Sequence, residues 1–271
     1  MNSLEFLYKT AFGRLLLKPL TSRGLSKLCG AFLDTGLSKG MIKSFVRKNN
    51  INEDDYILTD INSFNDFFCR RIKDGLRVID EAPENAIAPC DGLLTVYKIT
   101  PDTVVPVKQS AYTMKDLLKD VPLAEEFNGG ICMVYRLCVD HYHRYSYAES
   151  GVKGENTFIK GILHTVRPIA LSEYPVFVQN CREYCVIGTK DCGKVVQMEV
   201  GAMLVGRIVN NEKGVCDVLR GSEKGHFEYG GSTIIVLYQN GMVNVREDIM
   251  EASAAGNETP VRMGEKVGRK N

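Results

Sequence analysis

The stretch Gly225-His226-Phe227-Glu228-Tyr229-Gly230-Gly231-Ser232-Thr233 runs directly into Ile234-Ile235-Val236-Leu237-Tyr238. Its second part is a short run of mostly β-branched apolar residues, which is typical of a buried strand. The two glycines ahead of Ser232 carry no Cβ atoms and permit backbone conformations that other residues resist. The Ser232 hydroxyl could therefore approach the carbonyl of Gly231, although the same residues also fit an ordinary turn before a strand.

Short β-branched segments bounded by glycine or charged turns predict that strands dominate the chain after residue 90. These segments are 93–99, 131–139, 195–200, 202–209 and 233–238. In the third of them, apolar residues alternate with Gln197 and Glu199, which is the period-two pattern of a half-buried strand. Helices are predicted from Ser63 and over 114–120, where Thr113 can act as the N-cap.

The first fifty residues are predicted to be helical and basic. Apolar side chains fall at spacings that bring them onto one helical face, namely Leu4, Leu7, Tyr8, Ala11 and Leu15. Glycines at 24, 30, 36 and 40 interrupt the pattern, and a second amphipathic piece follows at 41–46. Nine basic residues against Glu5 and Asp34 give residues 1–50 a net charge of +7. Such helices can lie in an anionic headgroup layer, or they can cap the domain with a solvated basic face.

These segments together predict an α+β fold, with a mainly antiparallel β domain at 63–271 and an N-terminal helical section at 1–62. The whole chain of 271 residues has a net charge of +1, so no excess of positive charge points to nucleic acid. Nine cysteines without a CxxC pair, in a chain without a signal-peptide pattern, indicate a reducing compartment and predict no metal site. No apolar run approaches the ~20 residues that span a bilayer, so we expect any membrane contact to be peripheral.

Around Gly230-Gly231-Ser232-Thr233 the sequence resembles the phosphatidylserine decarboxylases. Members of this family are made as proenzymes and are cut at a Gly-Ser bond within an LGST or GGST motif. Several further motifs of the family recur here in the same order over roughly 200 residues, which makes chance similarity a poor explanation. They are Phe64-Asn65-Asp66-Phe67-Phe68-Cys69-Arg70, Ala88-Pro89-Cys90-Asp91-Gly92, Tyr142-His143-Arg144, Glu199-Val200-Gly201-Ala202 and Gly221-Ser222-Glu223-Lys224-Gly225.

The resemblance implies self-cleavage at the Gly231-Ser232 bond, which gives a β chain of residues 1–231 and an α chain of residues 232–271. Ser232 would attack the Gly231 carbonyl, and elimination and hydrolysis would convert it into a covalent pyruvoyl group, so no exogenous cofactor is needed. The pyruvoyl ketone forms a Schiff base with the substrate amine and takes up the electrons released as carbon dioxide leaves. The implied reaction converts phosphatidylserine, presented by an anionic membrane, into phosphatidylethanolamine.

The resemblance also assigns roles to an aspartate and to histidines. Asp91 matches the carboxylate that orients a histidine during serine activation, although its Asp-Gly pair also fits a simple turn. Many family members carry His-Arg-x-His, with the first histidine linked to decarboxylation and the second to self-cleavage. Here His143 is the first, and Ser146 stands at the position of the second. Either His143 serves both steps or His164 supplies the second imidazole from another strand, and the sequence leaves both open.

Other candidates and other functions follow from the same residues. Arg144 and Arg167 could pair with the substrate phosphate or carboxylate, and Cys90 is expected to be a packed thiol. The alternatives are a pyruvoyl decarboxylase of a soluble amino acid, a lipid-surface β module that is not cleaved, and an unprocessed serine hydrolase. The sequence around Ser232 does not have the GxSxG elbow that is typical of such hydrolases. For the leading function we expect peripheral attachment at the cytoplasmic face of the cell membrane, and the oligomeric state is left open.

Overall fold

The computed structural model describes residues 3–101, 105–107, 110–202, 207–229 and 232–271. The α-helices are α1 (Ser3–Lys9), α2 (Ala11–Leu20), α3 (Arg23–Leu33), α4 (Ile42–Asn49), α5 (Phe64–Phe68), α6 (Met114–Leu118), α7 (Val121–Glu125), α8 (Pro168–Leu171), α9 (Val176–Gln179) and α10 (Glu247–Ala254). Two 3-10 helices, η1 and η2, span Gly36–Met41 and Glu53–Asp55.

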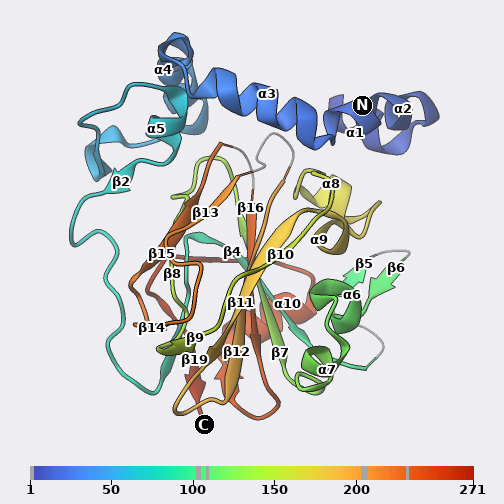
Figure 1. Cartoon of the computed structure of the whole chain (residues 1–271), viewed down its shortest axis with the longest axis vertical. Helices are drawn as coiled ribbons and strands as arrows, with labels where there is room; N and C mark the ends of the chain where they lie inside the picture. Colours follow the sequence, from blue (N-terminus) through green and yellow to red (C-terminus); the bar gives the residue numbers. More distant parts are fainter. Residues whose placement is uncertain (1–2, 102–104, 108–109, 203–206, 230–231) are drawn as a thin grey trace.

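The strands form one large antiparallel sheet and several small ones. Those of the large sheet, in spatial order, are β14 (Cys216–Val218), β9 (Gly151–Lys153), β11 (Arg182–Gly188), β12 (Lys194–Val200), β16 (Ser232–Tyr238), β7 (Ile131–Leu137), β4 (Gly92–Lys98) and β18 (Thr259–Val261), with β10 (Thr157–Ile159) also paired to β11. The small sheets pair β13 (Ile208–Asn210), β15 (Glu223–Phe227) and β8 (Arg144–Ser146); β17 (Val243–Val245), β19 (Lys266–Lys270) and β3 (Asn85–Ile87); β5 (Val105–Val107) and β6 (Ser110–Tyr112); and β1 (Tyr56–Ile57) and β2 (Arg71–Ile72). The predicted α+β fold is confirmed (Figure 1).

The predicted strand after Ser232 is β16, and it lies in the middle of the large sheet between β12 and β7. All seven of its residues are buried, because both faces of the sheet are covered. Ile235 and Leu237 point into one hydrophobic core, whereas Ile234 and Val236 point into a second core on the other face. This arrangement follows from the period-two alternation of a strand and explains why the run is apolar throughout.

The prediction that the strand at 195–200 is half-buried is wrong. Every residue of β12 except Lys194 is buried, including Gln197 and Glu199, which are fully buried. The polar side chains are tolerated because each has partners: Gln197 accepts a hydrogen bond from Ala148 N and donates one to Ser146 O, both at 2.9 Å. A buried polar group costs little when its hydrogen bonds are made. The polar residues at alternate positions of β12 therefore form a polar layer inside the protein and do not face solvent.

The N-terminal helices α1 to α4 lie across one end of the molecule (Figure 1). The expected single face over residues 4–15 is divided between two helices, because α1 ends at Lys9 and α2 begins at Ala11. A Cβ atom on Gly13 would lie 2.0 Å from the carbonyl oxygen of Phe6, so the close crossing of these helices requires glycine. The expected interruption at Gly24 and Gly30 is wrong, since α3 runs through both.

Two other predictions from the local sequence can be compared with the structure. The helix expected over 114–120 is α6, in which Thr113 and Asp116 form a capping box. The helix expected from Ser63 is α5, with Ser63 as its N-cap. Of the strand expected over 202–209, residues 203–206 lie outside the described residues, and β13 begins at Ile208. Among the described residues, no helix combines the length and apolar character needed to cross a membrane.

Candidate active site

Ser232 is the first residue of β16 and is fully buried. Its Oγ atom has no hydrogen-bond partner among the described residues. A buried hydroxyl without a partner costs about 1–3 kcal/mol, so such an atom calls for a functional explanation. Gly231, the other half of the expected cleavage site, lies outside the described residues.

One end of the large sheet gathers most of the candidate residues. The strand register places Leu93, Arg136, Thr233 and Val200 side by side across β4, β7, β16 and β12. Asp91 precedes β4, Ser232 begins β16, and the segment that carries His143 follows β7, so all three lie near this row. Strand β7 lies between β4 and β16 and therefore separates Asp91 from Ser232. Neighbouring strands in a sheet are ~4.8 Å apart. The antiparallel fold therefore brings together residues that are far apart in the sequence.

Asp91 is held by contacts that the sequence did not reveal. Its carboxylate forms an ion pair with Arg77, in which Nε donates to Oδ1 at 2.6 Å and Nη2 donates to Oδ2. The backbone N–H of Met263 also donates to Oδ1 at 2.9 Å. Within the described residues, the hydrogen bonds of Asp91 go to these two partners and not to an imidazole. Arg77 thus belongs to the site, and no motif in the sequence had marked it.

His143 is fully buried against the segment that leads to Ser232. Its Nδ1 atom lies 2.9 Å from the carbonyl oxygen of His141, and its ring centroid lies 4.1 Å from that of Phe68. Phe68 in turn packs on Tyr229, with a centroid distance of 5.2 Å. Tyr229 is three residues before Ser232, so the structure places His143 close to the segment in which cleavage is expected.

His164 occupies a different pocket, beneath α1. Its ring stacks on Tyr174 at a centroid distance of 4.6 Å, and its Nδ1 atom lies 3.3 Å from the hydroxyl oxygen of Tyr8. Burial lowers the pKa of His164 to about 4, an effect that the Gln179 side chain partly offsets. Asn180 links His164 to the end of β12, because it bonds both the His164 backbone and the carbonyl of Gly201. The structure joins His164 to Ser232 by no described hydrogen bond.

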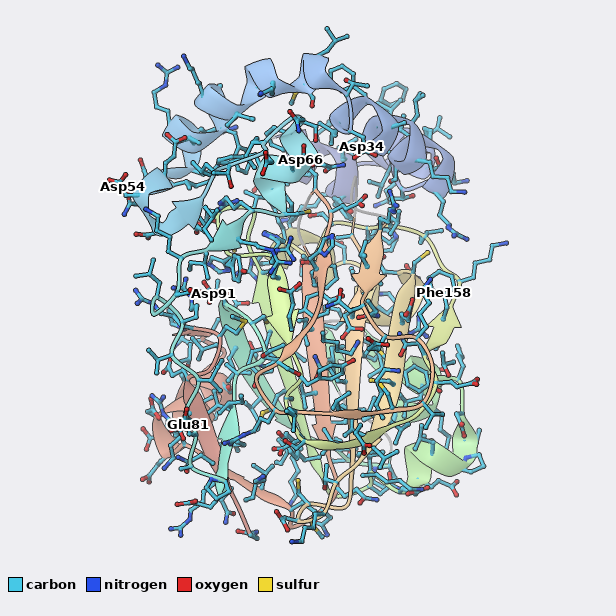
Figure 2. All side chains as sticks on the ribbon, turned by 60° about the vertical axis from the view of Figure 1, so that its left-hand side comes forward. Asp34, Asp54, Asp66, Glu81, Asp91 and Phe158 are labelled. Carbon is cyan, nitrogen blue, oxygen red and sulfur yellow. The ribbon has the colours of Figure 1, made fainter. Side chains whose placement is uncertain are left out.

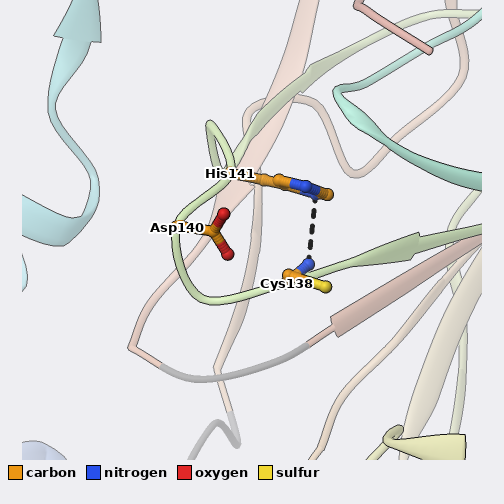
Figure 3. Close-up of side chains that lie close together, drawn as sticks. All are labelled: Cys138, Asp140 and His141. Carbon is orange, nitrogen blue, oxygen red and sulfur yellow. Dashed lines mark hydrogen bonds between the residues drawn. The ribbon is translucent and has the colours of Figure 1, made fainter. Parts of the chain in front are cut away.

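The turn after β7 places three side chains that could ligate a metal within 4.8 Å of one another, and in the described part of the chain they form the single such group. They are Cys138, Asp140 and His141 (Figure 3). His141 Nδ1 already accepts a hydrogen bond from Cys138 N at 3.2 Å, and burial raises the pKa of the Cys138 thiol. A protonated thiol is a poor metal ligand. The absence of a metal site remains a prediction.

The two arginines proposed for substrate binding differ in their surroundings. Arg144 is occupied by structural contacts: it donates to Glu223 at 2.7 Å and to the carbonyl of Cys69 at 2.8 Å. Arg167 is exposed at the start of α8, and its charge lowers the pKa of Tyr229, although burial raises that pKa more strongly. Cys90 is fully buried, and burial raises its thiol pKa, which agrees with a packed thiol.

Asn65 and the aromatic residues around it contact the segment before Ser232. The sequence marked them as part of a family motif but indicated no role for them. Asn65 accepts a hydrogen bond from Tyr229 N at 3.2 Å and donates to Asp34 Oδ1 at 2.6 Å. It therefore ties the segment before Ser232 to the end of α3. Four rings pack edge to face in this region: Phe45, Phe64, Phe68 and Tyr229. The spacing of the phenylalanines in Phe64-Asn65-Asp66-Phe67-Phe68 could have indicated that these side chains are packed, but not which residues they pack against.

The motif residues Glu199 and Lys224 form an ion pair inside the protein. Lys224 Nζ lies 2.7 Å from Glu199 Oε2, and both side chains are fully buried. Asn210 donates to Glu199 and accepts from Lys224, so the pair is part of a hydrogen-bonded network. This buried ion pair therefore joins β12 to β15 inside the protein.

A buried serine hydroxyl without a described partner lies at one end of the covered antiparallel sheet, and Asp91 and His143 are carried by segments near the same end, an arrangement that suits an enzyme. The sequence profile of the family described as phosphatidylserine decarboxylase matches residues 64–269. A phosphatidylserine decarboxylase proenzyme 2 of Clostridium acetobutylicum is 42% identical over 271 residues, which cover 100% of this chain and 92% of that protein. Proenzymes of Ruminiclostridium cellulolyticum and Clostridium perfringens are 38% and 36% identical, and this chain covers 90% and 94% of them.

The chain therefore belongs to the phosphatidylserine decarboxylase family. It is a carboxy-lyase that is made as a self-processing proenzyme.

Proposed function

We propose that this enzyme converts phosphatidylserine into phosphatidylethanolamine and carbon dioxide with a pyruvoyl group made from Ser232. Cleavage at Gly231-Ser232 would leave a β chain of residues 1–231 and an α chain of residues 232–271. The observation that carries the proposal is the Ser232 hydroxyl, which is buried without a described partner at the start of β16. The similarity of the full chain to named decarboxylase proenzymes supports the same conclusion.

The proposed self-cleavage balances without an added reagent other than water. Ser232 Oγ forms a bond to the Gly231 carbonyl carbon, the peptide C–N bond breaks, and the hydroxyl proton passes to the released nitrogen. Loss of the Ser232 Hα proton and cleavage of its Cβ–Oγ bond then free the Gly231 carboxylate and leave dehydroalanine. Water replaces the nitrogen, which leaves as ammonia, and a pyruvoyl group remains. Full burial of Ser232 supports this order of steps, because water that reached the ester before elimination would hydrolyse it.

The pyruvoyl ketone would supply an electron sink for decarboxylation. The protein's own groups would bind the lipid headgroup, exclude water and move protons. Asp91, held by Arg77, is suited to stabilise a positive charge that develops nearby. His143 lies against the segment before Ser232, which favours it as the proton carrier. His164 is neutral at neutral pH because its pKa is lowered to about 4, so it can accept a proton only weakly.

Intact mass spectrometry of Ser232→Ala tests the processing step. We expect one uncut chain without decarboxylase activity, because no hydroxyl remains to attack Gly231. The matched control is Ser44→Ala on α4, an exposed serine far from this chemistry in sequence, which should give two fragments with a ketone-bearing α chain. Full cleavage of Ser232→Ala would refute the mechanism. Normal processing without decarboxylation of phosphatidylserine would point instead to a soluble amino acid as the substrate.

Two alanine variants separate the histidines. We expect His143→Ala to impair decarboxylation at least as much as processing, and His164→Ala to impair processing if it supplies the second imidazole. Both rates are measured on the same purified chain, processing by intact mass and decarboxylation by release of carbon dioxide. If His164→Ala processes and decarboxylates like the parent, His143 acts alone or with Ser146.

We further propose that residues 1–62 attach the enzyme to the cytoplasmic face of the cell membrane, and that residues 63–271 form the catalytic domain. Large apolar side chains are exposed along the N-terminal helices, in particular Phe12, Leu15, Leu28, Phe32 and Leu37. Exposed apolar side chains beside basic ones suit an anionic lipid surface. The basic residues and these apolar ones lie in the layer at one end of the molecule (Figure 1).

Sedimentation with phosphatidylserine vesicles tests the attachment. Phe12→Ser with Leu15→Ser should weaken binding, because each side chain is about 60% exposed and free to enter lipid. Leu7, which the helical spacing had grouped with Leu15, is instead packed against the main core, so Leu7→Ser should lower stability. Binding should also weaken as salt rises, since screening shortens charge attraction to about 8 Å at physiological salt. Unchanged binding of the double variant would contradict the proposed surface.

A further inference from the structure

A cavity of about 340 Å³ lies between helix α3 and the segment that precedes Ser232. Arg23 and Lys27 of α3 line one wall, and Arg207, Glu228 and Tyr229 line another. Tyr229 is only three residues before Ser232. Leu163, which is adjacent to His164, also lines the cavity. One wall of the cavity thus belongs to the segment that leads to the proposed catalytic group, and its α3 wall belongs to the N-terminal section.

The charged groups of this cavity are mixed in sign. Three cationic side chains, Arg23, Lys27 and Arg207, face two carboxylates, Asp34 and Glu228. Arg207 lies 3.3 Å from Glu228, so these two largely neutralise each other. In the described part of the chain, neither Arg23 nor Lys27 forms an ion pair with a carboxylate. The Arg23 guanidinium lies over the Phe158 ring, with its Cζ atom 5.6 Å from the ring centroid, but this contact leaves the positive charge without a carboxylate partner. Both charges are therefore available to an anionic ligand at the α3 side of the cavity.

Helix α3 presents opposite faces to the cavity and to the outside. At 3.6 residues per turn, Arg23 and Phe32 point in opposite directions. Phe32 is 48% exposed and Leu28 is 70% exposed, whereas Ser26 and Leu33 are buried against the body of the protein. The outer side of the helix thus exposes large apolar side chains, which an ordinary surface helix would bury. An apolar medium on that side, such as a bilayer, would account for their exposure.

We propose that this cavity is the headgroup subsite of the enzyme, and that Arg23 and Lys27 bind the phosphate of phosphatidylserine. The inference rests on the proposed function. The headgroup carries two negative charges and one positive charge, which complements three cations and two carboxylates in the cavity. A volume of about 340 Å³ is at the lower end of the range for ligand pockets, so it suits a headgroup while the acyl chains remain outside. Figure 2 shows Asp34, another lining residue, beneath the N-terminal helical layer.

The subsite assigns α3 a role beyond membrane attachment. The apolar outer face would rest in the lipid while the basic inner face receives the headgroup of a lipid drawn from the same layer. Asn65 supports this geometry, because it joins Asp34 at the end of α3 to Tyr229 on the opposite wall. Changes to Arg23 and Lys27 should therefore affect substrate binding even when no membrane is present.

The test uses a short-chain phosphatidylserine that stays monomeric, so that vesicle attachment plays no part. Calorimetric titration of the uncut Ser232→Ala chain measures binding without turnover. Arg23→Gln with Lys27→Gln should weaken binding by about tenfold or more, since charge-assisted hydrogen bonds to phosphate are lost. The matched control is Lys39→Gln with Lys43→Gln, which removes two exposed charges of the N-terminal section outside the cavity and should bind as the parent does.

Kinetics of the processed enzyme provide the second readout. Arg23→Gln with Lys27→Gln should raise KM for the short-chain lipid by a similar factor, leave kcat nearly unchanged and leave self-cleavage intact. Equal affinity and equal KM in this variant and the parent would overturn the subsite. If the parent itself releases no carbon dioxide from phosphatidylserine, the proposed function fails, and that outcome is distinct from a failure of the subsite alone.

Discussion

Replacement of Asn65 by alanine should both destabilise the protein and slow its self-cleavage. The Asn65 side chain is 5% exposed, donates to Asp34 Oδ1 at 2.6 Å and accepts from Tyr229 N at 3.2 Å. A hydrogen bond to a charged group contributes about 1.5–3 kcal/mol, and a buried N–H left without a partner costs about 1–3 kcal/mol. Water that enters the space left by the side chain would replace some of these hydrogen bonds and so reduce the loss of stability. We therefore expect a decrease of about 3 kcal/mol in the free energy of unfolding.

The stability change is best measured in the Ser232→Ala background, where the chain stays uncut and a single polypeptide unfolds. Urea unfolding followed by far-UV circular dichroism gives the free energy from the midpoint and slope. The control is Asn62→Ala, whose exposed side chain donates to the Asp60 carbonyl and should change stability by less than about 0.5 kcal/mol.

Processing is measured in the chain that retains Ser232. Asn65→Ala should slow the appearance of the two fragments, because Tyr229 would lose the contact that fixes the segment before the cleaved bond. Asn65→Asp is a useful second variant, since it keeps an acceptor for Tyr229 N but places two carboxylates together at Asp34. A stability change below about 1 kcal/mol together with an unchanged cleavage rate for Asn65→Ala would refute this reasoning.

Three further outcomes are expected. Lys224→Met should lower the unfolding free energy by about 3–5 kcal/mol in urea titrations, because it leaves the Glu199 carboxylate buried without its cation, and Glu199→Gln in the same chain should restore part of the loss. The folded-state pKa values of His164 and His226 are lowered from 6.5 to about 4, chiefly by burial, so stability from these groups is complete above pH ~6.5 and is lost as the pH falls toward 4. A urea midpoint that does not fall between pH 7.5 and 5 would contradict those shifts. Asp91→Asn should slow self-cleavage in an intact-mass time course, and an unchanged rate would exclude a role for its negative charge.

The local sequence carried the prediction of the elements that build the site. The apolar run at 234–238 predicted β16, and Thr113 and Ser63 predicted the starts of α6 and α5. These features depend on side-chain alternation and on capping, which act within a few residues. The order of motifs around Ser232 likewise indicated the family, because each motif can be read without knowing its neighbours in space.

The tertiary structure decided which of these residues meet and what surrounds them. Arg77 holds Asp91, and Asn65 joins α3 to Tyr229, through contacts between segments far apart in the sequence. Burial of both faces of the large sheet turned an alternating pattern into a fully enclosed strand with a polar layer. Helix α3 shows the same dependence, because its glycines argued against a helix and packing outweighed their weak intrinsic preference. Propensity and motif are local properties, whereas burial, ion pairing and the shape of the cavity arise only when distant segments pack together.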